Sequence, residues 1–126
     1  MKRRRILNVN ILKKNNIEIA VINHEDILIK DGQSALDLIA TVRYETGCDH
    51  MILSKGAVSE EFFDLSTKLA GDVLQKFVNY QMRIAFVGDF SVYSSKSLKD
   101  FITESNKGNA IFFLPDENEA IEKLSE

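Results

Sequence analysis

The fold is decided by the apolar run Arg83-Ile84-Ala85-Phe86-Val87-Gly88, which has the composition of a central strand buried on both faces. A helical segment from Ser95 to Ser105 follows, and Ala110-Ile111-Phe112-Phe113-Leu114 is another apolar run. Helices between successive strands require parallel pairing through right-handed crossovers. We therefore expect an α/β protein with a parallel sheet built around this run.

The segments before the central run repeat the alternation of helix and strand. A helix is predicted from Asp31, with apolar positions at helical spacing and Gly47 as its left-handed end. Residues 51–53 form a short strand. Ser59 is expected to cap one long helix that continues to about residue 78 with a wide apolar face. The chain ends in a helix capped by Asp116, with Glu119 three residues on.

Two alternating stretches at the start predict an antiparallel hairpin. They cover residues 6–12 and 17–22, with a turn at residues 13–16, and residues 27–29 add a bridge or a small third strand. The expected architecture is a mixed sheet, an N-terminal hairpin followed by parallel strands, with about four helices. We expect residues 1–126 to form a single domain, with residues 1–5 as a flexible basic tip.

Composition excludes several classes of function. The net charge is −3 and the pI about 5.4, which gives no electrostatic basis for nucleic-acid binding. No segment approaches the roughly 20 apolar residues that span a bilayer. The only cysteine, Cys48, cannot form an internal disulfide, so we predict a reducing, cytoplasmic location.

Neither a metal, a cofactor nor an enzyme active site is predicted. Cys48, His24 and His50 lack the paired spacing of a zinc site. The sequence contains neither the phosphate-binding loop signature nor the dinucleotide fingerprint. No nucleophile and base fall into a recognisable triad or dyad.

Residues 88–96 are the most suggestive candidate site. They follow the carboxyl end of the central strand and lead into a helix N-terminus, where ligands collect in open α/β sheets. Ser94, Ser95 and Lys96 are candidates for holding an anionic group, and Asp89 for orienting a hydroxyl or a cation. Ser91 belongs to the same candidate set. The alternative is that these side chains only satisfy N–H groups of the turn and the helix cap.

A second candidate, Arg43, ends the first long helix. One possibility is that its guanidinium binds an anion there. The alternatives are that it pairs with groups near Glu45 or with the carbonyls at the helix C-terminus, which favour a cation. Residues 104–106 are interpreted as a helix end, with Asn106 or Gly108 as the left-handed stop.

The order of elements resembles the STAS-like (anti-sigma-factor-antagonist) fold over nearly the whole chain. More narrowly, residues from about 17 to 124 resemble DUF4180, a bacterial family of unknown function. Three stretches carry this resemblance. The first is Ser34-Ala35-Leu36-Asp37-Leu38 with Arg43-Tyr44-Glu45-Thr46-Gly47-Cys48, and the second is Leu69-Ala70-Gly71 with Leu74-Gln75-Lys76-Phe77-Val78-Asn79-Tyr80. The third is Val87-Gly88-Asp89-Phe90-Ser91 with Ser95-Lys96-Ser97-Leu98, Phe101-Ile102 and Glu104-Ser105-Asn106. The resemblance implies a fold and no catalytic residues.

Resemblance to anti-sigma-factor antagonists would imply a phosphorylated serine at the start of the second crossover helix. That place holds Ser59, without the expected glycine and beside Glu60 and Glu61, which would repel a phosphate. We therefore interpret Ser59 as a helix cap.

Three functions follow as hypotheses. The preferred one is a non-enzymatic protein-interaction or regulatory domain, with a protein partner or a homodimer formed through the helix at residues 62–77. The alternative is a small-molecule or lipid-binding sensor with its pocket at residues 88–96. The third is a small hydrolase that uses Asp89 or a serine.

Overall fold

A computed structural model, which describes residues 8–24 and 26–126, contains one five-stranded sheet in the order β1-β2-β3-β4-β5. The hairpin strands β1 (Val9–Lys14) and β2 (Ile17–Ile22) are antiparallel, and β3 (His50–Ser54), β4 (Arg83–Val87) and β5 (Ile111–Leu114) continue the sheet in parallel. The predicted mixed α/β architecture is confirmed.

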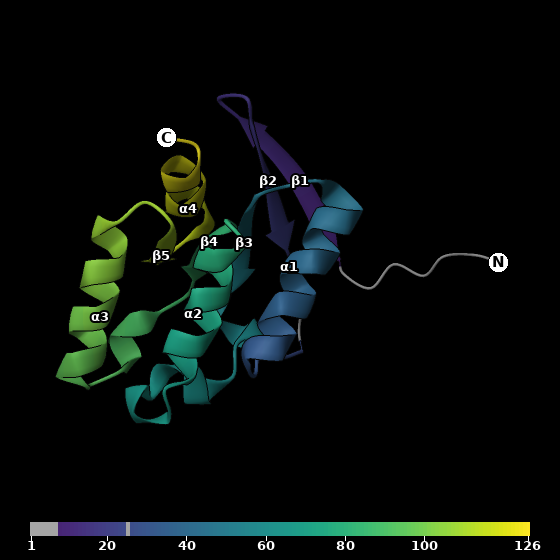
Figure 1. Ribbon diagram of the computed structural model, residues 1–126. Coiled ribbons are helices and arrows are strands. Elements are labelled where there is room, and N and C mark those ends of the chain that lie inside the picture. Colours follow the sequence, from purple (N-terminus) through teal and green to yellow (C-terminus); the bar gives the residue numbers. More distant parts are fainter. Residues whose placement is uncertain (1–7, 25) are drawn as a thin grey trace.

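Four helices cover the two faces of this sheet within the described residues. Three of them, α1 (Gly32–Thr46), α2 (Leu69–Asn79) and α3 (Lys96–Lys107), lie on one face, and α4 (Glu117–Leu124) packs on the other (Figure 1). Each helical crossover connects a strand to its next neighbour in the same direction across the sheet. Because all three crossovers have the same handedness, their helices lie on the same face. The strand order never reverses, and the sheet therefore has no switch-point crevice.

The sequence rules that begin and end the helices hold at most positions. Asp31 accepts a hydrogen bond from the Ser34 backbone N–H, and Gly47 ends α1 with a φ of 74°. Asp116 caps α4 by accepting from the Glu119 backbone N–H. Ile29 forms an isolated parallel bridge with Val58, as expected for a bridging segment.

The long helix predicted from Ser59 is wrong. Two 3-10 turns, Glu60–Phe63 and Leu65–Thr67, precede a shorter α2. The chain bends because Asp64 accepts a hydrogen bond from the Ser66 N–H and Lys68 adopts a φ of 65°, which is outside the helical region. The bend carries Phe62 into the core.

The apolar face expected to meet a partner is therefore buried within the chain. Phe62 and Phe77 are both fully buried, and the interior positions of α2 pack against α1 and the sheet. This face supplies the core and is not available for a homodimer. Ser59 does act as a cap, of the first 3-10 turn, by accepting from the Glu61 N–H at 3.4 Å.

Two further boundaries differ from the prediction. The hairpin turn is only Asn15-Asn16, both with positive φ, so Lys13 and Lys14 belong to β1. The predicted left-handed stop of α3 is also wrong, because Gly108 has a φ of −81° and Asn106 is not among the described residues with positive φ. The Asn106 side chain instead binds the backbone of Phe113 in β5.

The predictions for the basic tip and for the start of the first strand at Ile6 fall on residues 1–7, outside the described residues. No helix in the described part of the chain is both long and apolar enough to span a bilayer.

Candidate functional site

The loops that follow β3 and β4 meet at the carboxyl edge of the parallel sheet. Lys55 comes directly after β3, and Gly88 directly after β4. A Cβ atom added to Gly88 would lie 2.6 Å from the Cβ of Lys55, so the glycine lets the lysine stem cross the neighbouring loop. Parallel pairing of Ser54 with Val87 places these two positions side by side.

Asp89 and Ser91 form the turn that follows Gly88. The Asp89 carboxylate oxygen Oδ1 accepts hydrogen bonds from the Ser91 backbone N–H at 3.0 Å and from its hydroxyl at 2.5 Å. Both bonds hold the pKa of Asp89 below its ordinary value, and the bond from the hydroxyl has the larger effect. The positive charge of Lys55 lowers this pKa further. Asp89 is therefore ionised at neutral pH, and both of these bonds engage the same one of its two oxygens.

A hollow of about 400 Å³ opens beside this turn. Its walls combine an apolar floor with a polar rim: the lining residues are Gly88, Asp89, Phe90, Ser91, Ile102, Phe113 and Pro115. Phe113 is only 3% exposed and stands edge-on to Phe90, with ring centroids 5.5 Å apart. The site can therefore hold a small apolar group next to a carboxylate.

A polar clasp fixes the far end of the same loop. The Tyr93 hydroxyl donates to the Glu60 carboxylate at 2.9 and 3.0 Å, and the Lys55 ammonium lies 3.6 Å from that carboxylate and 5.0 Å from the Tyr93 ring centroid. The Tyr93 hydroxyl raises the pKa of Lys55 most, and the Glu60 carboxylate raises it further. Phe63 stacks on Tyr93 at 5.0 Å. The loop is thus anchored to the segment before α2.

The other predicted residues of this loop do not line the hollow. The Ser95 hydroxyl caps α3 by accepting from the Leu98 N–H, and Lys96 pairs with Asp100 at 2.8 Å. Ser94 is exposed in the loop just before the same helix. The structure therefore brings Asp89 and Ser91 together at the hollow but does not gather the three candidates for an anion.

Arg43 lies at the opposite, amino edge of the sheet. Its Nε donates to Asp49 at 2.9 Å and its Nη2 to the carbonyl of Gln81 at 3.1 Å. These contacts tie the end of α1 to the starts of β3 and β4. The guanidinium acts there as a structural tether.

Sequence reasoning missed Lys55, Glu60, Ile102 and Phe113 as parts of this region. A signal was available for Lys55, and also for Pro115 of the rim: both follow strands parallel to β4, and the carboxyl ends of parallel strands share an edge. Glu60 and Ile102 reach the loop only through the bend before α2 and the packing angle of α3, which the spacing of residues does not encode.

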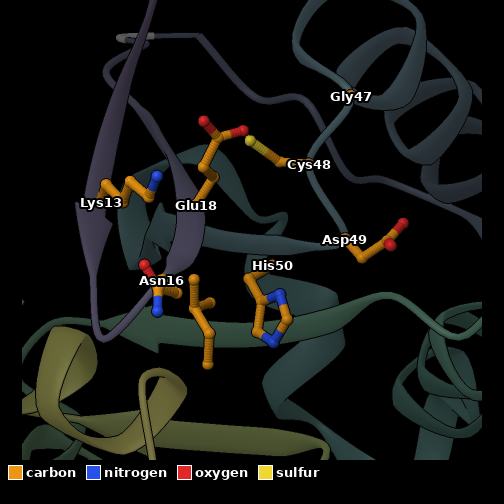
Figure 2. A pocket seen from close by; sticks show the side chains of 8 residues that line it. Lys13, Asn16, Glu18, Gly47, Cys48, Asp49 and His50 are labelled. Carbon is orange, nitrogen blue, oxygen red and sulfur yellow. The ribbon is translucent and has the colours of Figure 1, made fainter.

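A second hollow, of about 310 Å³, lies at the amino edge (Figure 2). Lys13, Asn16 and Glu18 line it from the hairpin. Cys48 lines it from the segment between α1 and β3, and His50 from the first position of β3. His50 Nε2 lies 3.3 Å from Arg83 Nη1, and burial, followed by the charge of Arg83, lowers the pKa of His50. No group of three potential metal-ligating side chains occurs among residues 8–24 and 26–126.

Arg83, next to this second hollow, makes structural contacts. Its guanidinium donates to the carbonyls of Asn109 at 2.6 Å and Leu124 at 3.3 Å, so it joins the start of β4 to the C-terminus of α4. A cation at a helix C-terminus is favourable. The Arg83 guanidinium therefore holds strand and helix ends together at this edge.

Comparisons with known proteins support a family and no activity. The family model described as "Domain of unknown function (DUF4180)" matches residues 14–124. Searches of curated proteins and of solved structures found no significant match. Because the match spans most of the chain, this protein belongs to the DUF4180 family.

Proposed function

We propose that this domain is a non-enzymatic regulatory module that binds a small amphipathic molecule in the hollow beside the Asp89-Phe90-Ser91 turn. The observation that carries the proposal is the juxtaposition of an ionised carboxylate with an apolar, aromatic-floored hollow at the carboxyl edge of the sheet. Concave sites with a few polar groups around an apolar floor are the usual form of small-molecule sites.

The chemistry of the lining selects the ligand. Phe90, Ile102 and Phe113 favour an alkyl or aromatic body. The Asp89 carboxylate favours a head group that donates hydrogen bonds, an amine above a hydroxyl, because the charge-assisted bond is stronger. A fatty acid would bring a second carboxylate to the same rim and be repelled. If the domain is a lipid-binding sensor, its lipid should therefore have a cationic or neutral head group.

Binding is a better use of this geometry than hydrolysis. The Ser91 hydroxyl does donate to Asp89, the contact that a serine nucleophile would need with its base. The lowered pKa of Asp89 makes that carboxylate a weak base, which argues against activation of Ser91. We therefore propose that the hydroxyl fixes the carboxylate for a ligand.

The test compares three ligands of one length, hexylamine, hexanol and hexanoate, by isothermal titration calorimetry. We expect hexylamine to bind best, hexanol more weakly and hexanoate not measurably. Asp89→Asn keeps an oxygen that accepts from Ser91 but removes the charge, so it should abolish the preference of the protein for the amine.

Asp64→Asn is the matched control. Asp64 accepts from the N–H and hydroxyl of Ser66 at 3.0 and 2.6 Å, the same arrangement away from the hollow. This variant should bind hexylamine like the unmodified protein. Equal binding of amine and carboxylate, or equal losses of binding in Asp89→Asn and Asp64→Asn, would overturn the proposed site.

We also propose three finer assignments. A STAS-like relationship is supported by a leading hairpin followed by parallel strands with three helices on one face. A bacterial origin is suggested by the sequence resemblance alone. A cytoplasmic location is supported by Cys48, a buried and unpaired thiol.

A further inference from the structure

The two outer edges of the sheet differ in whether a side chain covers them. At β5, the Asn106 side chain accepts from the Phe113 N–H at 2.7 Å and donates to the Phe113 carbonyl at 2.9 Å. At Phe113 the amide thus takes the place of a neighbouring strand. Blocking an edge in this way prevents another strand from adding there.

Within residues 8–24 and 26–126, the outer edge of β1 has no such cover. Two bonded positions fix which backbone groups of β1 point toward β2. The Asn23 N–H donates to the Asn8 carbonyl, and Lys14 and Ile17 flank the two-residue turn. The backbone N–H and C=O groups of the even-numbered residues of β1 are therefore the ones that bond to β2. The backbone groups of Val9, Ile11 and Lys13 must then point outward. Among the described residues no strand pairs with this side of β1, and no loop or side chain bonds to these three backbones.

We propose that β1 pairs with β1 of a second copy of this chain, antiparallel and centred on Ile11, so that two five-stranded sheets join into one. In this register Ile11 lies opposite Ile11 of the second copy, and Val9 opposite Lys13. Directly opposed outward residues exchange two backbone hydrogen bonds in an antiparallel pair. This inference is independent of the proposed ligand site.

Side chains favour this register over the one shifted by two residues toward the hairpin turn. Ile11 is 49% exposed, and pairing on the twofold axis buries both copies against each other. The two Lys13 side chains are four residues apart in register, about 13 Å along the strands, which is beyond the screening length in physiological salt. A shift that opposes Lys13 to Ile11 halves that separation and leaves an ammonium beside the isoleucine.

Symmetry makes a second copy the natural occupant. A twofold pair through β1 uses the same edge of both copies, so neither copy keeps a free β1 edge to which a third copy could add. A single six-residue strand pair buries less than the 1,200–2,000 Å², roughly, of a standard stable interface. The dimer should therefore be weak and depend on protein concentration.

Sedimentation velocity from low micromolar to millimolar protein tests this. The unmodified chain should shift from monomer to dimer, and Ile11→Pro should stay monomeric. Proline suits this position because the Ile11 N–H faces outward and is not needed by β2. The midpoint of denaturant unfolding at low concentration checks that Ile11→Pro still folds.

Two controls complete the design. Ile11→Lys keeps the N–H but places four ammonium groups at the seam, and should weaken the dimer without removing a donor. Val92→Lys, an exposed hydrophobic far along the chain, should leave it unchanged. A monomer throughout the range, or a dimer that survives both Ile11 substitutions, would contradict the proposal; the second result would point to another surface.

Discussion

Two turns of this protein have the same pattern, an aspartate, an apolar residue and a serine, yet the hollow of about 400 Å³ is lined by the second turn and not by the first. Asp64-Leu65-Ser66 and Asp89-Phe90-Ser91 each begin a 3-10 turn in which the aspartate accepts from the serine N–H and hydroxyl. The residue before each aspartate differs: it is the buried Phe63 in the first turn and Gly88 in the second.

That difference explains why one turn is structural and the other a candidate site. Phe63 fills the space behind its turn and stacks on Tyr93. Gly88 fills none, lets the Lys55 side chain cross, and itself lines the hollow. The Asp–Ser hydrogen bonds, which both turns share, therefore do not mark a candidate site. The feature that marks it is the hollow beside the second turn.

The largest effect is expected from the floor of the hollow. Phe113 is 3% exposed and stacks on Phe86 with ring centroids 5.0 Å apart. Phe113→Ala should lower the free energy of unfolding by about 3–5 kcal/mol, the usual loss for a buried phenylalanine. Urea denaturation followed by circular dichroism measures it; a loss below about 1 kcal/mol would show that the floor is not packed as described.

Filling the space at Gly88 should cost less. The new methyl of Gly88→Ala would meet the Lys55 Cβ at 2.6 Å, so we expect a loss of about 1–3 kcal/mol in the free energy of unfolding. Gly71→Ala is the control, because nothing lies within 4 Å of the added methyl and helix propensity favours alanine by about 1 kcal/mol. Urea denaturation of both variants gives the two changes in the free energy of unfolding. Equal changes in Gly88→Ala and Gly71→Ala would contradict a special role for the glycine at position 88.

Titration separates the two aspartates. The Ser66 hydroxyl and then its N–H lower the pKa of Asp64, whereas at Asp89 the Lys55 charge adds to the two Ser91 bonds. Lys55→Met should therefore raise the pKa of Asp89 and leave that of Asp64 unchanged, as measured by carbon NMR of the carboxyl groups. A parallel rise at both sites would show that the lysine acts through unfolding.

The sign of the pH dependence follows from these lowered pKa values. Both carboxylates stabilise the folded state above the ordinary aspartate pKa of 3.8, and that contribution is lost as the pH falls through the lower folded value. Amine binding at Asp89 should fail over the same acidic range, because the protonated acid no longer attracts a cation.

The smallest effect is expected at Lys96. It is exposed and pairs with Asp100 on the surface of α3, so Lys96→Ala should change the free energy of unfolding by at most about 0.5 kcal/mol. Hexylamine binding should not change in the same variant. A large loss of binding would contradict the surface role that the structure gives this residue and bring Lys96 back into the site.

The predictability of each element follows from how local its cause is. The central strand, α1 and α4 were predictable, because their apolar spacing and caps, such as Asp31 and Asp116, lie within a few residues of the element. The break between Ser59 and α2 was not predictable from periodicity. The bend made by Asp64 and Lys68 goes with the packing of Phe62 against Phe86 and Phe113, which are distant in sequence and leave no mark on the local periodicity.

The candidate site divides along the same line. Asp89 and Ser91 were found because they follow a strand directly, at the place where ligands gather in α/β sheets. Ile102, which completes the hollow, depends on how α3 packs against β5. The β5 edge closure by Asn106 was likewise missed, because an asparagine near a helix end usually signals a cap.

The most direct test of the ligand site is an NMR titration of the nitrogen-15-labelled protein with hexylamine, in which both turns are observed at once. We predict that the amide signals of Asp89, Phe90, Ser91 and Ile102 move with ligand concentration while those of Asp64 and Ser66 stay in place. Equal movement at both turns, or movement at neither, would contradict the assignment of the site to the hollow beside Asp89.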